Sequence, residues 1–388
     1  MLSFTQINLH KATQASMLVG EGLEGQRQTI VLMTEPYTHG GKITGMPKGT
    51  KVIQARNTDK TKPPRAGIVT SLGNTITAMD SWCNRDCAVA LARIGGTQTV
   101  IVSLYLDITA EVQPPWLDNL MEMIDKKGYP LIMGVDSNGH SSLYGPSNNS
   151  RGNAFEDFVL QYGLMVENRG GAPTFETKRG NKLIATHIDV TLTRGLRAKL
   201  QNWRVSREYN ASDHNSILFE IETHKPEPDL IRPWSKAKWD TFTEILKRAE
   251  YAIPKDMSMK KLDKLVAKTY ATLENALNTA CPLSKISPTV GKSHWANDKH
   301  KKAKAKVSDL YKQAKQRNLD SDWTAYKEAD KNFKRMCKAD KNRAWRKYKE
   351  CIQTEKEMAS LARQAQHCLL YTSPSPRDRQ KSRMPSSA

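Results

Sequence analysis

Polar residues with catalytic potential stand where short apolar segments of the first 222 residues end. Asp136 and Asn138 follow the apolar run LIMGV, while Asp213 and His214 precede the run that begins at Ser216. Hard divalent cations prefer carboxylate oxygens, and a histidine beside a carboxylate can exchange a proton near neutral pH. Amides can hold a phosphate or a water. The pattern indicates metal-assisted acid–base chemistry, and the full set is Asn8, Glu35, Tyr105, Asp136, Asn138, Asp189, Asp213 and His214.

Each of these residues, taken alone, also has a structural explanation. A carboxylate after a strand can cap a helix or form a turn. Asp189 is harder to explain in this way, because it lies inside the apolar run HIDVTL, where a charge needs a partner. We interpret His187 as a substrate-side or structural group and His140 as a loop residue.

Short apolar or alternating segments must position these residues, and they have the length and composition of strands. Segments with helical spacing separate several of them. Strands mixed with helices, without a strict βαβ repeat, predict a two-sheet α/β sandwich with helices outside. The sequence contains neither a P-loop nor a dinucleotide fingerprint. The expected strands are 4–9, 30–34, 66–71, 88–93, 99–106, 131–135, 187–193 and 216–221, and the expected helices are 12–25, 115–127 and 153–162.

Charge divides the chain into two contrasting parts. Residues 1–222 hold 23 basic and 21 acidic residues, whereas residues 223–388 hold 37 and 19 and carry +18 of the total +20. A strongly basic part indicates a polyanionic partner. No apolar run approaches the roughly 20 residues of a membrane span, and the N-terminus does not resemble a signal peptide. We therefore expect no membrane partner and no secretion, and the scattered cysteines indicate a reducing compartment.

Composition predicts four stretches. Residues 1–222 form the α/β domain, residues 223–293 a linker with short helices (239–249 and 259–280), residues 294–366 a basic helical segment, and residues 367–388 a disordered tail that is not necessarily natural. In the basic segment, aromatic residues at helical spacing can stack on bases or form a helical core, and lysines such as Lys299, Lys301 and Lys302 can bind phosphates of DNA or RNA.

Eight stretches in consistent order give the first domain a family resemblance. They are QINLHKA, LMTEPY, VSLYLD, GVDSNGHSSLYG, RGNAFEDFVLQYGL, NRGGAPTFET, HIDVTLT and SDHNSILFEI. Together they resemble the exonuclease–endonuclease–phosphatase superfamily, which has a DNase I-like fold. More specifically, they are similar to the apurinic-like endonuclease domain of non-LTR (LINE-type, jockey-like) retrotransposon polyproteins. The chain has no polymerase Y/F-x-D-D motif, so we expect a product truncated before the reverse transcriptase.

The resemblance implies a role for each site residue. Glu35 would be the principal Mg²⁺ ligand, with Asn8 beside it, and Mn²⁺ would be a substitute metal. Asp136 and Asn138 would position the attacking water and the phosphate, and Tyr105 would stabilise developing charge. Asp213 and His214 match the family's S-D-H motif, with Asp213 in the metal-binding group. His214 would be the general base or a protonated stabiliser, oriented by Asp189.

The expected function is that of an Mg²⁺-dependent DNA endonuclease that leaves a 3′-hydroxyl primer for reverse transcription. Its expected site of action is the nucleus, with the cytoplasm as a second location. The alternatives are an apurinic repair-type endonuclease and an inactive fragment that only binds nucleic acid. Lys42, Lys48 and Arg151 are candidate DNA contacts, although a solvated surface explains such charges equally well. Ser150 is the expected N-cap of the helix that contains Arg151.

Overall fold

The computed structural model describes residues 1–24, 26, 28–47, 49–56, 62–71, 76–180, 182–222, 230–232, 237–249, 258–285 and 298–350. Its contacts divide the chain into two units, Met1–His224 with Thr289–Ala388, and Lys225–Pro288. The expected tail, the first residues of the expected basic segment and Lys48 lie outside the described residues.

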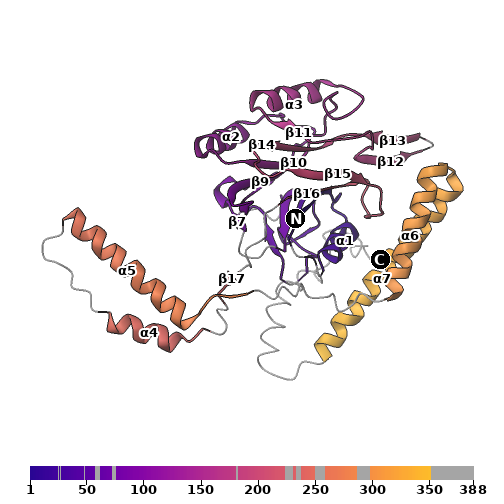
Figure 1. Ribbon diagram of the computed structural model, residues 1–388. Coiled ribbons are helices and arrows are strands. Elements are labelled where there is room, and N and C mark those ends of the chain that lie inside the picture. Colours follow the sequence, from indigo (N-terminus) through magenta and orange to yellow (C-terminus); the bar gives the residue numbers. More distant parts are fainter. Residues whose placement is uncertain are drawn as a thin grey trace, which may run out of the picture. The chain divides into compact units, whose positions relative to one another are not determined.

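Two six-stranded sheets form the centre of the first unit (Figure 1). Sheet 1 has the order β15–β16–β1–β2–β6–β5, and sheet 2 has the order β11–β14–β10–β9–β8–β7. The strands of sheet 1 are β1 (Leu2–Asn8), β2 (Thr29–Thr34), β5 (Lys51–Ile53), β6 (Ala66–Thr70), β15 (Leu200–Ser206) and β16 (Ser216–Ile221). Those of sheet 2 are β7 (Ile76–Ala78), β8 (Cys87–Ile94), β9 (Thr97–Tyr105), β10 (Leu131–Asp136), β11 (Met165–Val166) and β14 (Asp189–Arg194).

Three hydrophobic clusters hold these layers together. One joins the facing sides of the two sheets, with Phe4 and Phe219 stacked at 4.8 Å between ring centroids. Helices α2 (Pro115–Lys127) and α3 (Ser150–Gln161) cover the outer face of sheet 2 through residues such as Leu120 and Phe158. Helix α1 (Thr13–Leu23) packs on sheet 1. The expected α/β sandwich of two sheets with helices outside is therefore confirmed.

Two further two-stranded sheets belong to the first unit. They pair β3 (Thr38–His39) with β4 (Lys42–Ile43), and β12 (Phe175–Arg179) with β13 (Lys182–Thr186). A short 3₁₀ turn spans Asp80–Trp82. The N-cap of α3 is Asn149 rather than the expected Ser150, because the Asn149 side chain accepts a hydrogen bond from the Gly152 amide. A capping residue must stand outside the first helical turn, and the helix begins at Ser150.

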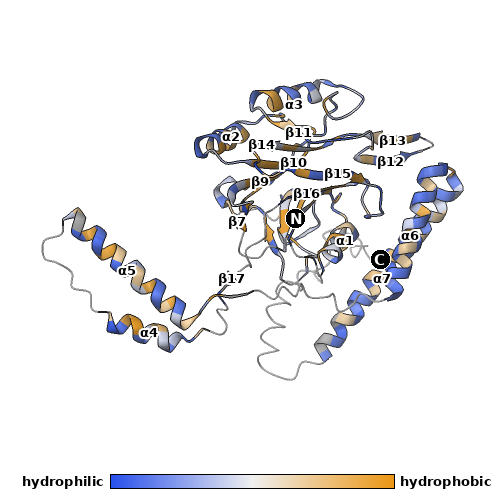
Figure 2. Cartoon of the chain, in the orientation of Figure 1, coloured by the Kyte–Doolittle hydropathy of each residue, from blue (hydrophilic) through white to orange (hydrophobic). Residues whose placement is uncertain are grey.

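Two helices complete the first unit. Helix α6 (Asp298–Arg317) and helix α7 (Asp320–Glu350) are mostly hydrophilic, as Figure 2 shows. Their apolar residues form a cluster around Tyr209, in the loop between β15 and β16. Trp323 and Phe333 are buried in this cluster, so these two aromatic side chains belong to a core. We refer to α6 and α7 together as the helical hairpin.

The second unit contains α4 (Trp239–Arg248) and α5 (Met259–Ala280), where the sequence predicted helices. Strand β17 (Leu230–Ile231) pairs with β18 (Ser284–Lys285). Arg232 donates hydrogen bonds to the Leu277 and Cys281 carbonyls and thereby ties this strand pair to the end of α5. None of the described helices is both long and apolar enough to cross a membrane.

Gly152 permits a close approach between α3 and the loop that follows β10. A Cβ atom at this position would lie 1.7 Å from the His140 carbonyl oxygen, which is backbone and cannot rotate away. We expect Gly152→Ala to lower the free energy of unfolding by about 3 kcal/mol, measured by urea denaturation. Gly22→Ala is the matched control, because a Cβ atom there meets nothing within 4 Å. Equal stability of the two variants would contradict this contact.

Candidate active site

Sheet 2 brings three of the candidate residues onto adjacent strands. Asp136, the last residue of β10, lies opposite Asp189 of the antiparallel β14 and beside Tyr105 of the parallel β9. Both carboxylates are almost completely buried, with 1% and 2% of their surfaces exposed. The register of sheet 2 therefore places two buried carboxylates and a phenol at one edge.

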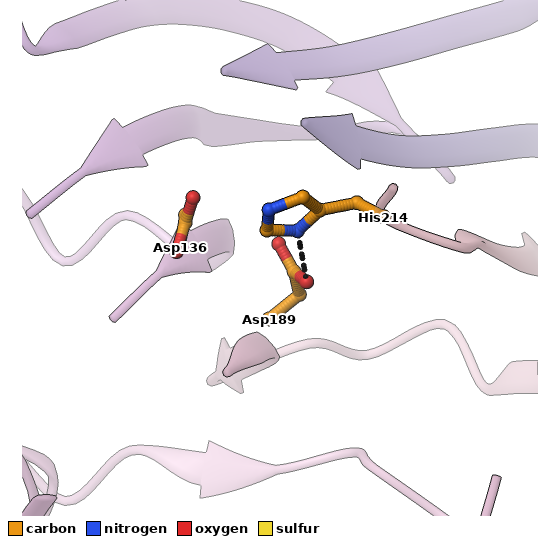
Figure 3. A group of neighbouring side chains, drawn as sticks. All are labelled: Asp136, Asp189 and His214. Carbon is orange, nitrogen blue, oxygen red and sulfur yellow. Dashed lines mark hydrogen bonds and ion pairs between the residues drawn. The ribbon is translucent and has the colours of Figure 1, made fainter. Parts of the chain in front are cut away.

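His214 enters this edge from the loop before β16. Its Nδ1 atom lies 2.8 Å from Oδ2 of Asp189, and only 5% of the residue is exposed (Figure 3). The second ring nitrogen lies on the side of the ring that faces Asp136. Burial lowers the pKa of His214, but the charge and hydrogen bond of Asp189, with Asp136 and Asp213, outweigh burial and raise it to about 9. His214 and Asp189 thus form a buried, charge-stabilised pair.

Sheet 1 contributes a further acidic group. Asn8 ends β1 and Glu35 follows β2, and these two strands run parallel to each other. The Asn8 amide nitrogen donates to Asp136 at 2.7 Å and reaches Glu35 at 3.5 Å, so a single amide links carboxylates from both sheets. Glu35 has a φ of 43°, a backbone conformation that non-glycine residues rarely adopt and that often marks functional sites. Lys11 pairs with the other Glu35 oxygen at 3.0 Å.

The carboxylates fit a hard divalent cation. Asp136 Oδ1 is buried and has no hydrogen-bond partner among the described residues, while its other oxygen is held by Asn8. Ligand atoms of Asp136, Asp189 and His214 lie within 4.8 Å of one another. Because Asp189 holds Nδ1 of His214 and the imidazole is protonated at neutral pH, the donors best placed for a cation are the Asp136 and Glu35 oxygens. Burial and the Asp189 charge raise the pKa of Asp136 to about 7, which a nearby positive charge would reverse.

These residues share one pocket of about 400 Å³. Tyr105, Asn138 and Asp213 also line it, so the pocket includes every candidate catalytic or metal-binding residue except the buried Asp189, which lies behind His214. Burial, together with Glu35 and Asp136, raises the pKa of Tyr105 to about 12, so its hydroxyl remains a donor at neutral pH. His140 lines the pocket, whereas His187 does not.

The residues expected to bind DNA lie in different environments. Lys42 is exposed in β4, and Lys299, Lys301 and Lys302 are exposed in the first turns of α6. Arg151 donates from its guanidinium to the carbonyls of Ser137, Ala110 and Asp107, and these contacts tie the loop after β9 to the end of β10. A DNA contact of Arg151 stays a prediction, and what the structure shows is this contact between loops.

Sequence reasoning missed the residues that surround the His214–Asp189 pair. The Thr174 hydroxyl oxygen accepts hydrogen bonds from the Ile188 and Asp189 amides, both at 3.0 Å. The Phe175 ring meets the His214 ring edge-on at 5.0 Å. Both residues lie in the stretch NRGGAPTFET, which supported the resemblance without a role for either. Arg65 packs over the Tyr105 ring at 4.7 Å and binds Asp86 and Asp107.

Comparison with known proteins gives one family and several relatives. Residues 99–218 match a family model described as endonuclease-reverse transcriptase. The chain is 24% identical over 302 residues to a putative 115 kDa protein in type-1 retrotransposable element R1DM of Drosophila melanogaster, covering 72% of this chain and 28% of that protein. It is also 24% identical over 214 residues to a Pol polyprotein from type-1 retrotransposable element R1 of Bradysia coprophila, covering 52% of this chain and 21% of the relative.

Among solved structures, the endonuclease domain of TRAS1, a telomere-specific non-LTR retrotransposon, matches with 24% identity and a TM-score of 0.48, covering 58% of this chain and all of that one. An AP endonuclease from Leishmania major matches with 10% identity and a TM-score of 0.43, covering 57% and 88%. The chain spans about a quarter of the length of the two curated relatives that it matches.

A two-sheet α/β sandwich with a His–Asp pair and further carboxylates at one edge is the arrangement that the resemblance to the exonuclease–endonuclease–phosphatase superfamily predicts. Residues 99–218, which lie within the first domain, are similar to the endonuclease-reverse transcriptase family, and the two curated relatives are named as proteins of retrotransposable elements. The resemblance predicted from the sequence is confirmed.

Proposed function

We propose that the chain is a divalent-cation-dependent DNA endonuclease that hydrolyses a phosphodiester bond in one strand of a duplex and leaves a 3′-hydroxyl. One observation carries this proposal. His214, which is paired with the buried Asp189, lines the same pocket as the Asp136 and Glu35 carboxylates. Asp136 ends β10 of sheet 2, and Glu35 follows β2 of sheet 1. Hydrolysis of a phosphodiester needs an activated water, neutralisation of the phosphate charge and stabilisation of the leaving oxygen.

The chain's own residues can meet the proton-transfer requirements. Asp136, whose buried Oδ1 has no hydrogen-bond partner among the described residues, can position the attacking water together with Asn138. His214, whose pKa is about 9, is protonated at neutral pH and can donate from Nε2 to a phosphate oxygen. Of the two roles considered for His214, this value supports that of a protonated stabiliser, with Asp189 fixing the ring. The Tyr105 hydroxyl can donate a hydrogen bond to the leaving oxygen.

Glu35 and Asp136 would hold the metal ion, and Asn8 would keep the two carboxylates together. Bound Mg²⁺, or Mn²⁺ in its place, would supply positive charge to the phosphate and the leaving oxygen. Both ions prefer oxygen donors, and the unpartnered Oδ1 of Asp136 supports such a site.

The positive net charge of the chain supports duplex DNA, a polyanion, as the substrate. The net charge is +20, and the helical hairpin, residues 298–350, holds 18 basic and 8 acidic residues. Lysines such as Lys42, Lys301 and Lys302 would track phosphates, and binding of this kind is non-specific and weakened by salt. The hairpin could bind element RNA in the same way.

A nick with a 3′-hydroxyl could prime reverse transcription by a longer polyprotein of the retrotransposon type. The relatives are named as proteins of retrotransposable elements, and the chain covers about a quarter of their length. Action on chromosomal DNA would place the protein in the nucleus.

The experiment that tests this function compares two substrates. The full chain with Mg²⁺ is incubated with intact supercoiled plasmid and with a duplex oligonucleotide that carries one abasic site. We expect open circles from the plasmid at a rate at least comparable with abasic cleavage, and no cutting in EDTA. Cleavage of the abasic duplex alone would instead indicate a repair-type endonuclease. A folded chain that cuts neither substrate would leave only a nucleic-acid-binding fragment.

A further inference from the structure

We propose that the helical hairpin is part of the endonuclease's catalytic unit, and that Lys315 of α6 is a positioning residue that holds the loop carrying His214. The functional part of this inference rests on the proposed nuclease activity. Its structural part, the placement of His214 against Asp189, can be measured without any cleavage.

The hairpin fixes the beginning of the His214 loop through Tyr209. The Tyr209 ring lies 6.0 Å from the Tyr311 ring and 6.2 Å from the Tyr326 ring, both edge-on, and its hydroxyl donates to Asp330 of α7. The next residue, Asn210, donates from its side chain to the His214 carbonyl at 2.7 Å. The hairpin therefore anchors Tyr209, and the next residue, Asn210, directly holds the His214 backbone.

Lys315 fixes the other end of the same loop. Its ammonium group donates to the Glu176 carboxylate and, at 3.1 Å, to the side-chain oxygen of Asn215, which directly follows His214. The Lys315 and Glu176 side chains are only 10% and 8% exposed. The Asn215 amide nitrogen also donates to Glu176, at 2.6 Å. Removing one partner of such a buried pair leaves an uncompensated charge, so the contact is sensitive to substitution.

The network continues to both members of the catalytic pair. The Glu176 amide donates to the Asp213 carbonyl at 2.8 Å, and the Asn215 amide donates to the Thr174 carbonyl at 2.6 Å. The Thr174 hydroxyl holds the Asp189 amide. One short segment, 174–176, thus joins the strand of Asp189 to the loop of His214, and Lys315 ties this segment to Asn215. Loss of the Lys315 contacts should displace His214 relative to Asp189.

The kinetic test uses the full chain and measures kcat and KM for plasmid nicking. We expect Lys315→Met to lower kcat by about 10- to 100-fold with little change in KM, because small displacements of catalytic groups have effects of this size. Lys315→Arg, which keeps the charge and the donors, should restore most of the loss. Lys126→Met on the exposed surface of α2 is the charge-matched control and should behave as wild type. An increase in KM with unchanged kcat would show a DNA contact instead and would overturn the inference.

A second measurement does not depend on cleavage. In protein labelled with ¹⁵N-histidine, the proton on Nδ1 of His214 should give a downfield NMR signal because it is hydrogen-bonded to Asp189. We expect this signal to shift or disappear in Lys315→Met and to persist in Lys315→Arg and Lys126→Met. The neutral pair Lys315→Gln with Glu176→Gln avoids a buried unpaired charge and should fold even if Lys315→Met does not, with the signal still displaced. An unchanged signal in the folded variants would overturn the inference, whereas an inactive wild type with a displaced signal would refute only the nuclease function.

Discussion

Replacing Asp189 by asparagine should lower the rate of DNA nicking by about 1,000-fold or more. The carboxylate holds Nδ1 of His214 at 2.8 Å and supplies much of the charge that keeps the imidazole protonated. An amide of the same shape removes that charge and can present an N–H group to the ring, which orients the wrong tautomer. Effects of this order are known for a carboxylate behind a catalytic histidine.

The Asp189 prediction needs a control for charge alone. Asp157→Asn changes an exposed carboxylate on α3 and should leave the nicking rate unchanged. Circular dichroism must show that Asp189→Asn is folded, because the carboxylate is buried. If the folded Asp189 variant nicks plasmid within a factor of about 10 of wild type, the His214–Asp189 pair is not the catalytic pair.

Replacing Glu35 by glutamine should lower nicking at a fixed, low Mg²⁺ concentration by about 100-fold, and excess metal should recover part of the loss. The substitution removes one negative charge from a donor set in which Asp136 Oδ1 has no partner among the described residues. Metal-ligand and metal-orienting groups typically contribute 10- to 100-fold or more. Titration of the nicking rate with Mg²⁺ and with Mn²⁺ measures the shift directly.

Glu111→Gln is the matched control for the metal prediction, since Glu111 is exposed and does not line the pocket. EDTA should abolish nicking by wild type and both variants, and added Mg²⁺ should restore it. If Glu35→Gln required the same Mg²⁺ concentration as wild type, Glu35 would not be a metal ligand. Activity in the presence of excess EDTA would contradict metal dependence altogether.

Much of the site was predictable because its residues terminate strands whose own composition is distinctive. Strands such as β2 and β10 are buried along their whole length, so they appear in the sequence as continuous apolar runs followed by Glu35 or by Asp136 at the end. Asp189 was recognisable because a charge inside an apolar run needs a partner. The family resemblance then assigned the roles.

The pairing of distant strands was not predictable, because local patterns carry no information about register. Nothing in the sequence shows that Asp136 lies opposite Asp189, or that Thr174 holds the Asp189 amide. Strand β15 was missed because its residues are mostly polar, and a register shift between Gln201 and Arg204, with Asn202 at a φ of 55°, interrupts its alternation. The contacts of Lys315 were not predictable for a similar reason, since its partners Asn215 and Glu176 lie 100 and 139 residues away in the chain.

The most direct test of the account examines the end that the enzyme leaves. Plasmid treated with the full chain and Mg²⁺ is incubated with a DNA polymerase and labelled nucleotides, without prior phosphatase treatment, beside plasmid treated with His214→Ala. We expect the wild-type product to incorporate label at the nick, because hydrolysis leaves a 3′-hydroxyl, and the variant product to incorporate none. Nicks that accept label only after removal of a 3′-phosphate, or equal labelling with His214→Ala, would contradict it.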